Sequence, residues 1–265
     1  MVMDRQFGFS DQELKRYKDE GFVVRQGVFT DEEIHGFHLG VEEAIETALQ
    51  LARQGKSYTL DGKSFVDFAE YTIQFEHTPE SKDLRVIEPV HSLAENLAVL
   101  LSEQRLLQPM QSILGCSALA LWTNKLNCKG PGGSAFDWHQ DSPYWVHDSG
   151  HVDLLPNVMI SFDSFDRENG CLRAIVGSHK AGCLPGRVDG SQLGGFYTDS
   201  KVIDLADEVL FEVCPGSLIF FDPHLIHGSG ENKSSNSRRA MILTFQPAGH
   251  PSLKSGETIN CPLPG

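Results

Sequence analysis

Beyond Gly115 the sequence consists of short apolar segments separated by turn-forming residues, and this pattern constrains the fold more than any other feature of the chain. Glycine, proline, asparagine and aspartate residues separate the segments. Spacing of this kind is typical of a β-sandwich or a closed β-barrel. We therefore expect a mostly β core over about 116–250, made of strands within residues 118–126, 158–162, 171–176, 209–213, 217–221 and 240–245.

The first third of the chain, about 1–115, is predicted to be helical. Two capping boxes mark helix starts, since a serine or threonine is followed three residues later by glutamate. Apolar residues recur at helical spacing behind the second box. The two boxes pair Ser10 with Glu13 and Thr30 with Glu33.

The sequence also predicts the local structure of four other segments. Residues 56–76 mix glycine, serine and aromatic residues and are interpreted as a loop. A helical stretch is expected over about 92–114, with a break near Pro109. Residues 181–207 form a long glycine-containing loop, of the length usually associated with function or disorder. An irregular tail is expected after Pro251, and the whole chain, 1–265, is interpreted as one domain.

The charge balance excludes several classes of protein. The 265 residues carry 22 Lys and Arg against 36 Asp and Glu, a formal net charge of −14. Nucleic-acid-binding proteins usually carry a basic surplus, and so do helices that bind anionic lipid. No apolar run approaches the roughly 20 residues of a membrane span. The six cysteines contain no C-x-x-C pair, and no signal peptide is recognisable. We expect a reduced cytoplasmic protein that binds neither nucleic acid nor membrane.

The first chemical signal is the segment around His139 and Asp141. Residues i and i+2 of a strand point to the same face, so an imidazole and a carboxylate would project together. Such a pair is two-thirds of the 2-His-1-carboxylate triad that binds iron(II) and leaves coordination positions open. A single His-x-Asp is a weak signal that often arises by chance, and a surface turn with a solvated histidine and aspartate is the simpler alternative.

The second signal follows the apolar run Ser217–Phe221, where two histidines come after a turn. Either His224 or His227 is able to supply the third ligand. They are three residues apart, so they would not share one face of a strand. One of them is expected to be a bystander whose polar atoms are satisfied by hydrogen bonds.

The third signal is the alternating segment that begins with Arg238 and Arg239. Period 2 places Arg238 on one face together with Ala240 and Ile242, like a cation at the end of a cavity wall. Arg239 belongs to the opposite face, with apolar residues suited to pack against helices. A planar guanidinium suits a bidentate carboxylate partner. An ordinary pair of arginines entering a strand from solvent is the simpler alternative.

Taken together, these segments resemble the phytanoyl-CoA dioxygenase-like family of iron(II)- and 2-oxoglutarate-dependent oxygenases. The order His139-x-Asp141, His227 and then Arg238 matches the motifs of that family. The resemblance covers most of the chain. It includes the opening Tyr17–Val24 and the central segment Asn169–His179, where Val176 replaces the usual proline.

The resemblance implies a double-stranded β-helix, or cupin-like jelly roll, flanked by helices, an α+β arrangement. It implies that iron(II) is bound by His139, Asp141 and His227, so it selects His227 over His224. It also implies that the far carboxylate of 2-oxoglutarate meets Arg238, assisted by the Ser229 hydroxyl. Asn127 and Trp145 match family positions near the co-substrate, although Asn127 also fits a turn and Trp145 also fits the core.

The activity implied is that of a dioxygenase. With O2 and 2-oxoglutarate it would hydroxylate an unactivated C–H of a small organic molecule, such as a specialised metabolite or an amino-acid-like compound. Succinate and CO2 would be released. Two alternatives remain open: an acyl-CoA 2-hydroxylase, and a metal-binding jelly-roll protein without redox turnover. The substrate segments are expected at 56–76 and 181–207, where Phe196 and Tyr197 would form part of a lid.

Overall fold

Two antiparallel sheets form the framework of the protein. The computed structural model describes residues 6–77 and 82–253. Within these residues one sheet has nine strands in the order β1-β11-β8-β13-β6-β5-β4-β3-β2, and the other has four in the order β10-β9-β12-β7. The strands are β1 (Phe22–Arg25), β2 (Lys56–Leu60), β3 (Lys63–Phe68), β4 (Tyr71–Phe75), β5 (Leu84–Glu88), β6 (Leu119–Lys129), β7 (Phe136–His139), β8 (Asn157–Ser161), β9 (Leu172–Ile175), β10 (Glu208–Leu210), β11 (Leu218–Phe221), β12 (His227–Ser229) and β13 (Arg238–Pro247).

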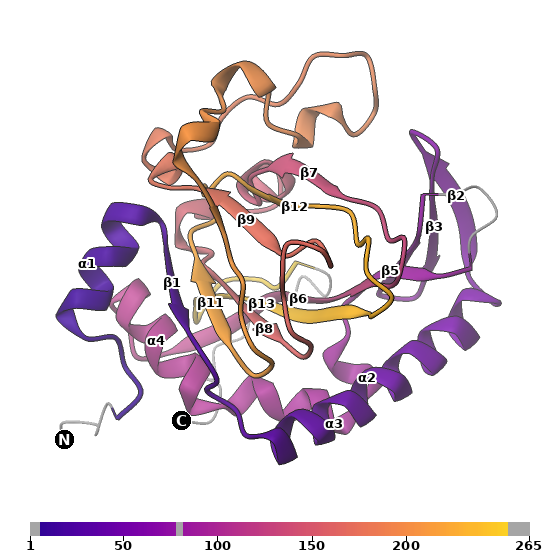
Figure 1. The fold of residues 1–265 in the computed structure, drawn as a ribbon, viewed down its shortest axis with the longest axis horizontal. Helices are drawn as coiled ribbons and strands as arrows, with labels where there is room; N and C mark the ends of the chain where they lie inside the picture. The colour runs from indigo at the N-terminus through magenta and orange to yellow at the C-terminus, as the bar shows by residue number, and fades with distance from the viewer. Residues whose placement is uncertain (1–5, 78–81, 254–265) are drawn as a thin grey trace.

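The first four helices pack into the core on the outer side of the large sheet (Figure 1). Both capping boxes are confirmed, because each hydroxyl accepts the backbone N–H of its glutamate and each glutamate accepts the N–H of its cap residue. Methionines, leucines and aromatic residues of the sheet pack against the second and fourth helices. The helices are α1 (Asp11–Glu20), α2 (Asp31–Ala52), α3 (Glu95–Ala98), α4 (Gln104–Leu114) and α5 (Ser142–Trp145).

Strand β13 shows how the sequence alternation builds two cores. Met241, Leu243 and Phe245 face the helices and belong to the core on that side. Ala240 and Ile242 face the small sheet and belong to the core between the sheets. The predicted assignment of alternate residues to a helix-packed face and a cavity face is therefore confirmed. A two-sheet jelly roll flanked by helices results, as the sequence predicts.

Two expectations for the first third are wrong. Residues 56–76 are three strands, β2, β3 and β4, which extend the large sheet beyond β5 (Figure 1). The helical stretch of 92–114 is broken at Glu103, which caps α4, whereas Pro109 lies inside α4. The predicted tail lies outside the described residues beyond Leu253.

No helix among the described residues is long and apolar enough to cross a membrane. The segment of 181–207, between β9 and β10, contains only short 3-10 turns and lies beyond the small sheet (Figure 1). Its ties to the small sheet include a backbone hydrogen bond from the Thr198 N–H to the Trp138 carbonyl at 2.9 Å. The loop thereby covers the end of the jelly roll that carries β7.

Candidate metal and co-substrate site

Three side chains named from the sequence converge between the two sheets. One ligand atom from each of His139, Asp141 and His227 lies within 4.8 Å of the others. Strands β7 and β12 bring the two histidines together, because His227 is the register partner of His139. The glycine between the third ligand and Ser229 permits this approach, since a Cβ on Gly228 would lie 2.8 Å from the Phe136 carbonyl oxygen.

Asp141 reaches the cluster by a different route from the one expected. Strand β7 ends at His139, and Asp141 has helical backbone angles as the cap residue of α5. The expectation that a shared strand face aligns the pair is therefore wrong. Instead, the backbone N–H of Asp141 donates to the Pro223 carbonyl at 3.1 Å. This hydrogen bond ties the turn after β7 to the segment that precedes β12.

Hydrogen bonding fixes the histidine tautomers. The Nδ1 atom of His139 lies 2.7 Å from the Asp137 carbonyl oxygen, and that of His227 lies 2.9 Å from the Leu225 carbonyl oxygen. A carbonyl only accepts, so each Nδ1 carries a proton and each Nε2 lone pair is free. Burial lowers the pKa of His139 to about 3 and lowers that of His227 as well. Both rings are therefore neutral, the form that binds metal.

Asp141 is held as a carboxylate. Burial alone would raise its pKa, but Lys125 and the neighbouring His227 and His139 together outweigh this effect, and the pKa is lowered. The Lys125 Nζ atom lies 3.5 Å from Oδ1, and Asn157 donates its side-chain N–H to Oδ2 at 3.0 Å. One carboxylate and two neutral imidazoles form the donor set that suits non-haem iron(II).

His224 does not belong to the cluster. Its Nδ1 atom lies 2.8 Å from the Ser142 hydroxyl, and its Nε2 atom lies 2.7 Å from a carboxylate oxygen of Asp153. The expectation that one of the two histidines is a bystander satisfied by hydrogen bonds is confirmed. His224 thus holds Ser142, the residue after Asp141, by a hydrogen bond and has no free ring nitrogen for a metal.

Arg238 is a buried cation without an anion. Its exposed fraction is 1 %, and its Nε and Nη1 atoms have no hydrogen-bond partner among the described residues. Burial lowers its pKa to about 10. Burying an unpaired guanidinium costs free energy, so an incoming carboxylate would be bound strongly. The neighbouring Arg239 points away, as period 2 predicts, and pairs with Asp163 at 2.9 Å.

Lys129 is a residue that the sequence reasoning missed. It is 1 % exposed, donates to the Ser229 hydroxyl at 2.7 Å and also donates to the Gly230 carbonyl. Burial and the nearby charge of Arg238 lower its pKa to about 6. The signal that points to it is the second of two lysines, Lys125 and Lys129, which lie four residues apart in strand β6. With a pKa of about 6 the Lys129 amine is largely neutral near pH 7, so it serves as a hydrogen-bond donor to Ser229 rather than as a second fixed cation.

The two weaker sequence candidates both border the cavity. Asn127 is buried on the same face of β6 as Lys129, and its side-chain oxygen has no partner among the described residues. Trp145 lines the cavity but also packs edge to face against Trp122, with ring centroids 6.5 Å apart. The geometry therefore keeps Asn127 as a binding candidate and gives Trp145 a packing role as well.

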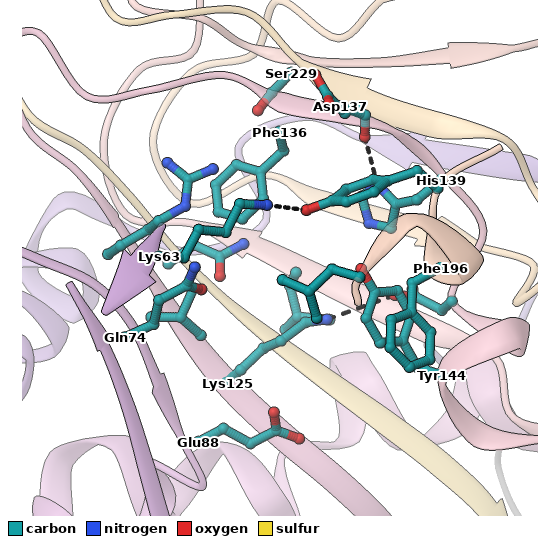
Figure 2. Close-up of a pocket in the computed structure, with 18 of the residues that line it drawn as sticks. Lys63, Gln74, Glu88, Lys125, Phe136, Asp137, His139, Tyr144, Phe196 and Ser229 are labelled. Atoms are coloured by element: carbon teal, nitrogen blue, oxygen red, sulfur yellow. Dashed lines mark hydrogen bonds and ion pairs between the residues drawn. The ribbon is translucent and has the colours of Figure 1, made fainter. Parts of the chain in front are cut away.

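One cavity of about 790 Å³ is lined by the triad together with Lys125, Asn127, Trp145, Ser229 and Arg238. Figure 2 shows Lys125, His139 and Ser229 around it. The aromatic pair Tyr144 and Phe196 closes one side, with stacked rings whose centroids are 4.4 Å apart. The side chains Lys63, Gln74 and Glu88 enter from β3, β4 and β5. The strands missed in 56–76 therefore supply part of the cavity wall.

Comparisons with known proteins agree with this geometry. Residues 17–240 match the model of the family described as phytanoyl-CoA dioxygenase (PhyH). An ectoine dioxygenase of Streptomyces avermitilis is 28% identical over 251 residues, covering 88% of this chain and 77% of that protein. A 2-aminoethylphosphonate dioxygenase from the uncultured bacterium HF130_AEPn_1 is 25% identical, covering 89% of this chain and 81% of that protein.

Solved structures of similar fold include EctD from S. alaskensis crystallised with 2-oxoglutarate and 5-hydroxyectoine. Its TM-score is 0.69 at 19% identity, and the match covers 97% of this chain and 86% of that one. A second EctD structure, with bound Fe, has a TM-score of 0.64 at 22% identity over 93% of this chain and 79% of that one. The architecture is thus the double-stranded β-helix of these proteins. Because the family model spans most of the sequence, the chain belongs to the PhyH family and is a 2-oxoglutarate-dependent dioxygenase.

Proposed function

We propose that this protein binds iron(II) through His139, Asp141 and His227 and hydroxylates a C–H bond of a small organic molecule. The observation that carries the proposal is the joint occurrence, in one cavity, of this donor set and the unpaired buried guanidinium of Arg238. A metal site without redox turnover has no need of that guanidinium. When bound, iron and 2-oxoglutarate supply the O2-dependent oxidation, with succinate and CO2 as products.

The residues of the chain have separate tasks in this proposal. Arg238, with the Ser229 hydroxyl beside it, binds the far carboxylate of 2-oxoglutarate. Lys125 keeps Asp141 ionised, and the carbonyls behind the histidines keep their rings turned toward the metal. The stacked rings of Tyr144 and Phe196 limit the access of water to the site.

A small polar metabolite is the substrate class that we favour. Related proteins are named for ectoine, 2-aminoethylphosphonate and, in an L-proline trans-4-hydroxylase of Streptomyces griseoviridis, for proline. A cavity of about 790 Å³ has the size of ordinary small-molecule sites. The polyanionic acyl-CoA of the family's namesake suits a chain of net charge −14 less well.

The experiment that tests the proposal has two stages. Anaerobic addition of iron(II) and then 2-oxoglutarate is expected to produce the weak visible charge-transfer band of the chelate. Admission of O2 together with a library of small metabolites is then expected to give succinate above the background for at least one compound. Arg238→Met should abolish the band at low 2-oxoglutarate, whereas Arg239→Met should retain it. A protein that binds iron but never forms the chelate contradicts the proposal.

A further inference from the structure

A second group of nitrogen donors, two of them cationic, lines the cavity away from Arg238 and Lys129. It consists of Lys63 on β3, His77 just after β4 and Arg85 on β5. All three come from the strands that extend the large sheet beyond β6, whereas Arg238 and Lys129 belong to β13 and β6. Figure 2 shows Lys63 entering the cavity on the side of Gln74.

Two of these side chains have buried donors with no partner. The Nε2 atom of His77 and the Nε atom of Arg85 are both inaccessible to solvent, and neither makes a hydrogen bond among the described residues. Arg85 lines the cavity and is only 2 % exposed. Unpaired buried donors are costly, and a ligand that satisfies them gains the corresponding free energy on binding.

The carboxylates near this group are already engaged. Glu76 lies 3.3 Å from the Arg85 guanidinium and also accepts the backbone N–H of Ser134 at 3.1 Å. Asp137 pairs with Arg187 at 3.0 Å. Both nearby carboxylates therefore already have partners other than Lys63 and His77. No carboxylate in the described structure pairs with Lys63.

Lys63 has only a neutral partner. Its ammonium group donates to the Tyr197 hydroxyl and lies 4.6 Å from the centre of that ring. The local potential is positive, since burial and then the charges of Arg85 and Lys63 lower the pKa of His77 to about 4. Although the chain has an overall surplus of acidic residues, the electrostatic potential around Lys63 and Arg85 is therefore positive.

We infer that Lys63, His77 and Arg85 form a subsite that binds an oxyanion of the substrate, a carboxylate or a phosphonate. The inference rests on the proposed function and narrows its substrate to small organic acids. Charge-assisted hydrogen bonds from a guanidinium and an ammonium suit such a group. The backbone of Tyr197, whose hydroxyl meets Lys63, pairs with that of His139. The subsite is thereby linked to the metal-binding strand.

The test measures binding of two anions to protein loaded with iron(II) and saturating 2-oxoglutarate in the absence of O2. The anions are methylphosphonate and N-acetyl-L-proline, and their uncharged counterparts are dimethyl methylphosphonate and N-acetyl-L-prolinamide. Calorimetry is expected to show saturable binding of at least one anion and at least tenfold weaker binding of its counterpart, a difference of about 1.4 kcal/mol.

The matched variants are Lys63→Met and Lys56→Met. Both remove one lysine charge from the β2–β3 hairpin, but Lys56 is exposed and does not line the cavity. Lys63→Met is expected to weaken anion binding at least tenfold, and Lys56→Met to leave it unchanged. Equal binding in both variants, equal binding of the neutral counterparts, or no saturable anion binding by the wild type would overturn the inference.

The same samples separate this inference from the proposed function. Affinity for 2-oxoglutarate, read from the chelate band, is expected to be equal in the wild type and Lys63→Met. A selective loss of 2-oxoglutarate affinity in Lys63→Met would show that Lys63 serves the co-substrate and would overturn the subsite. A wild type that fails to form the chelate contradicts the proposed function, whatever its anion binding.

Discussion

The imidazole rings of His139 and His227 lie 4.2 Å apart, centre to centre, and their backbones are direct partners in the small sheet. Each ring is turned by a hydrogen bond from its own Nδ1 to a carbonyl two residues earlier in the chain. Both histidines are thus oriented by the same local hydrogen bond. The orientation of the donors is set before a metal arrives, which lowers the cost of binding it.

Removal of any member of the triad is expected to abolish metal binding. His139→Ala, Asp141→Ala and His227→Ala should each weaken iron(II) binding roughly 100-fold or more, since changes to supporting residues alone cost 10- to 100-fold. Metal content after anaerobic reconstitution checks this. His224→Ala is the control: it should retain iron while losing about 1–3 kcal/mol of unfolding free energy, because Ser142 and Asp153 lose their partner. Full iron occupancy in His227→Ala would contradict the ligand assignment.

Arg238→Ala is expected to raise the KM for 2-oxoglutarate strongly. Truncation of one partner of a buried charge pair costs roughly 2–5 kcal/mol. Arg239→Ala should leave this KM unchanged and instead lower thermal stability, since Arg239 bridges Asp163 and Glu42 across the helix-covered face. Succinate formation at varied 2-oxoglutarate concentration separates the two variants. Comparable KM increases would contradict the register of β13.

The titration of Lys129 predicts a pH dependence of stability. Its pKa is about 6 in the folded protein against 10.5 normally. Between these values the unfolded chain binds more protons than the folded one, so the unfolding free energy rises with pH, by up to about 1.4 kcal/mol per unit. Denaturant unfolding of the metal-free protein from pH 6.5 to 8.5 should show this rise. Lys129→Met should flatten it, and an unchanged slope would contradict the assignment.

The aromatic residues of the covering loop are predicted to couple co-substrate use to substrate oxidation. Phe196 stacks on Tyr144, and Tyr197 contacts Lys63, so the double variant Phe196→Ala/Tyr197→Ala opens the cavity. The expected result is continued release of succinate with less product formed per succinate. The ratio is measured with a substrate found in the metabolite screen. A ratio that stays at one, with an unchanged substrate KM, would show that these rings do not close the site.

Asp61 is predicted to fasten the same loop. Its two carboxylate oxygens accept the backbone N–H groups of Gln192 and Leu193 at 3.0 and 2.7 Å. Asp61→Asn keeps a residue that tolerates the left-handed backbone of this turn, with φ 48°, but leaves only one accepting oxygen. Faster hydrogen exchange is expected at these two amides. Glu70→Gln, at the next turn of the meander, is the control and should leave it unchanged.

The metal ligands were predictable because their spacing carries the signal. His139-x-Asp141 and a later His before a strand that begins with arginine indicate two of the three candidate ligands, even though Asp141 lies in a helical turn rather than on a strand. The choice of His227 over His224 was not contained in the spacing. It came from the family resemblance, and in the structure it depends on hydrogen bonds of His224 to residues distant in sequence.

The hairpin of residues 56–68 was missed for a physical reason. Strand β2 is exposed along most of its length, so it lacks the apolar alternation that marks a half-buried strand. Its turn, Asp61-Gly62, is a common hairpin sequence, and it was the available clue. Lys63 faces the cavity because β5 pairs with β6 and β4, β3 and β2 follow it in the sheet. This long-range pairing leaves no local pattern in the sequence.

The position of this hairpin at the free edge of the large sheet has a consequence for diversification. Strand β2 pairs only with β3, and neither strand touches the backbone of a metal ligand. Substitutions within residues 56–68 can therefore change the cavity wall at Lys63, or the loop contact at Asp61, without moving the backbone of the triad. Redesign of selectivity in this scaffold would begin at that edge rather than in the barrel.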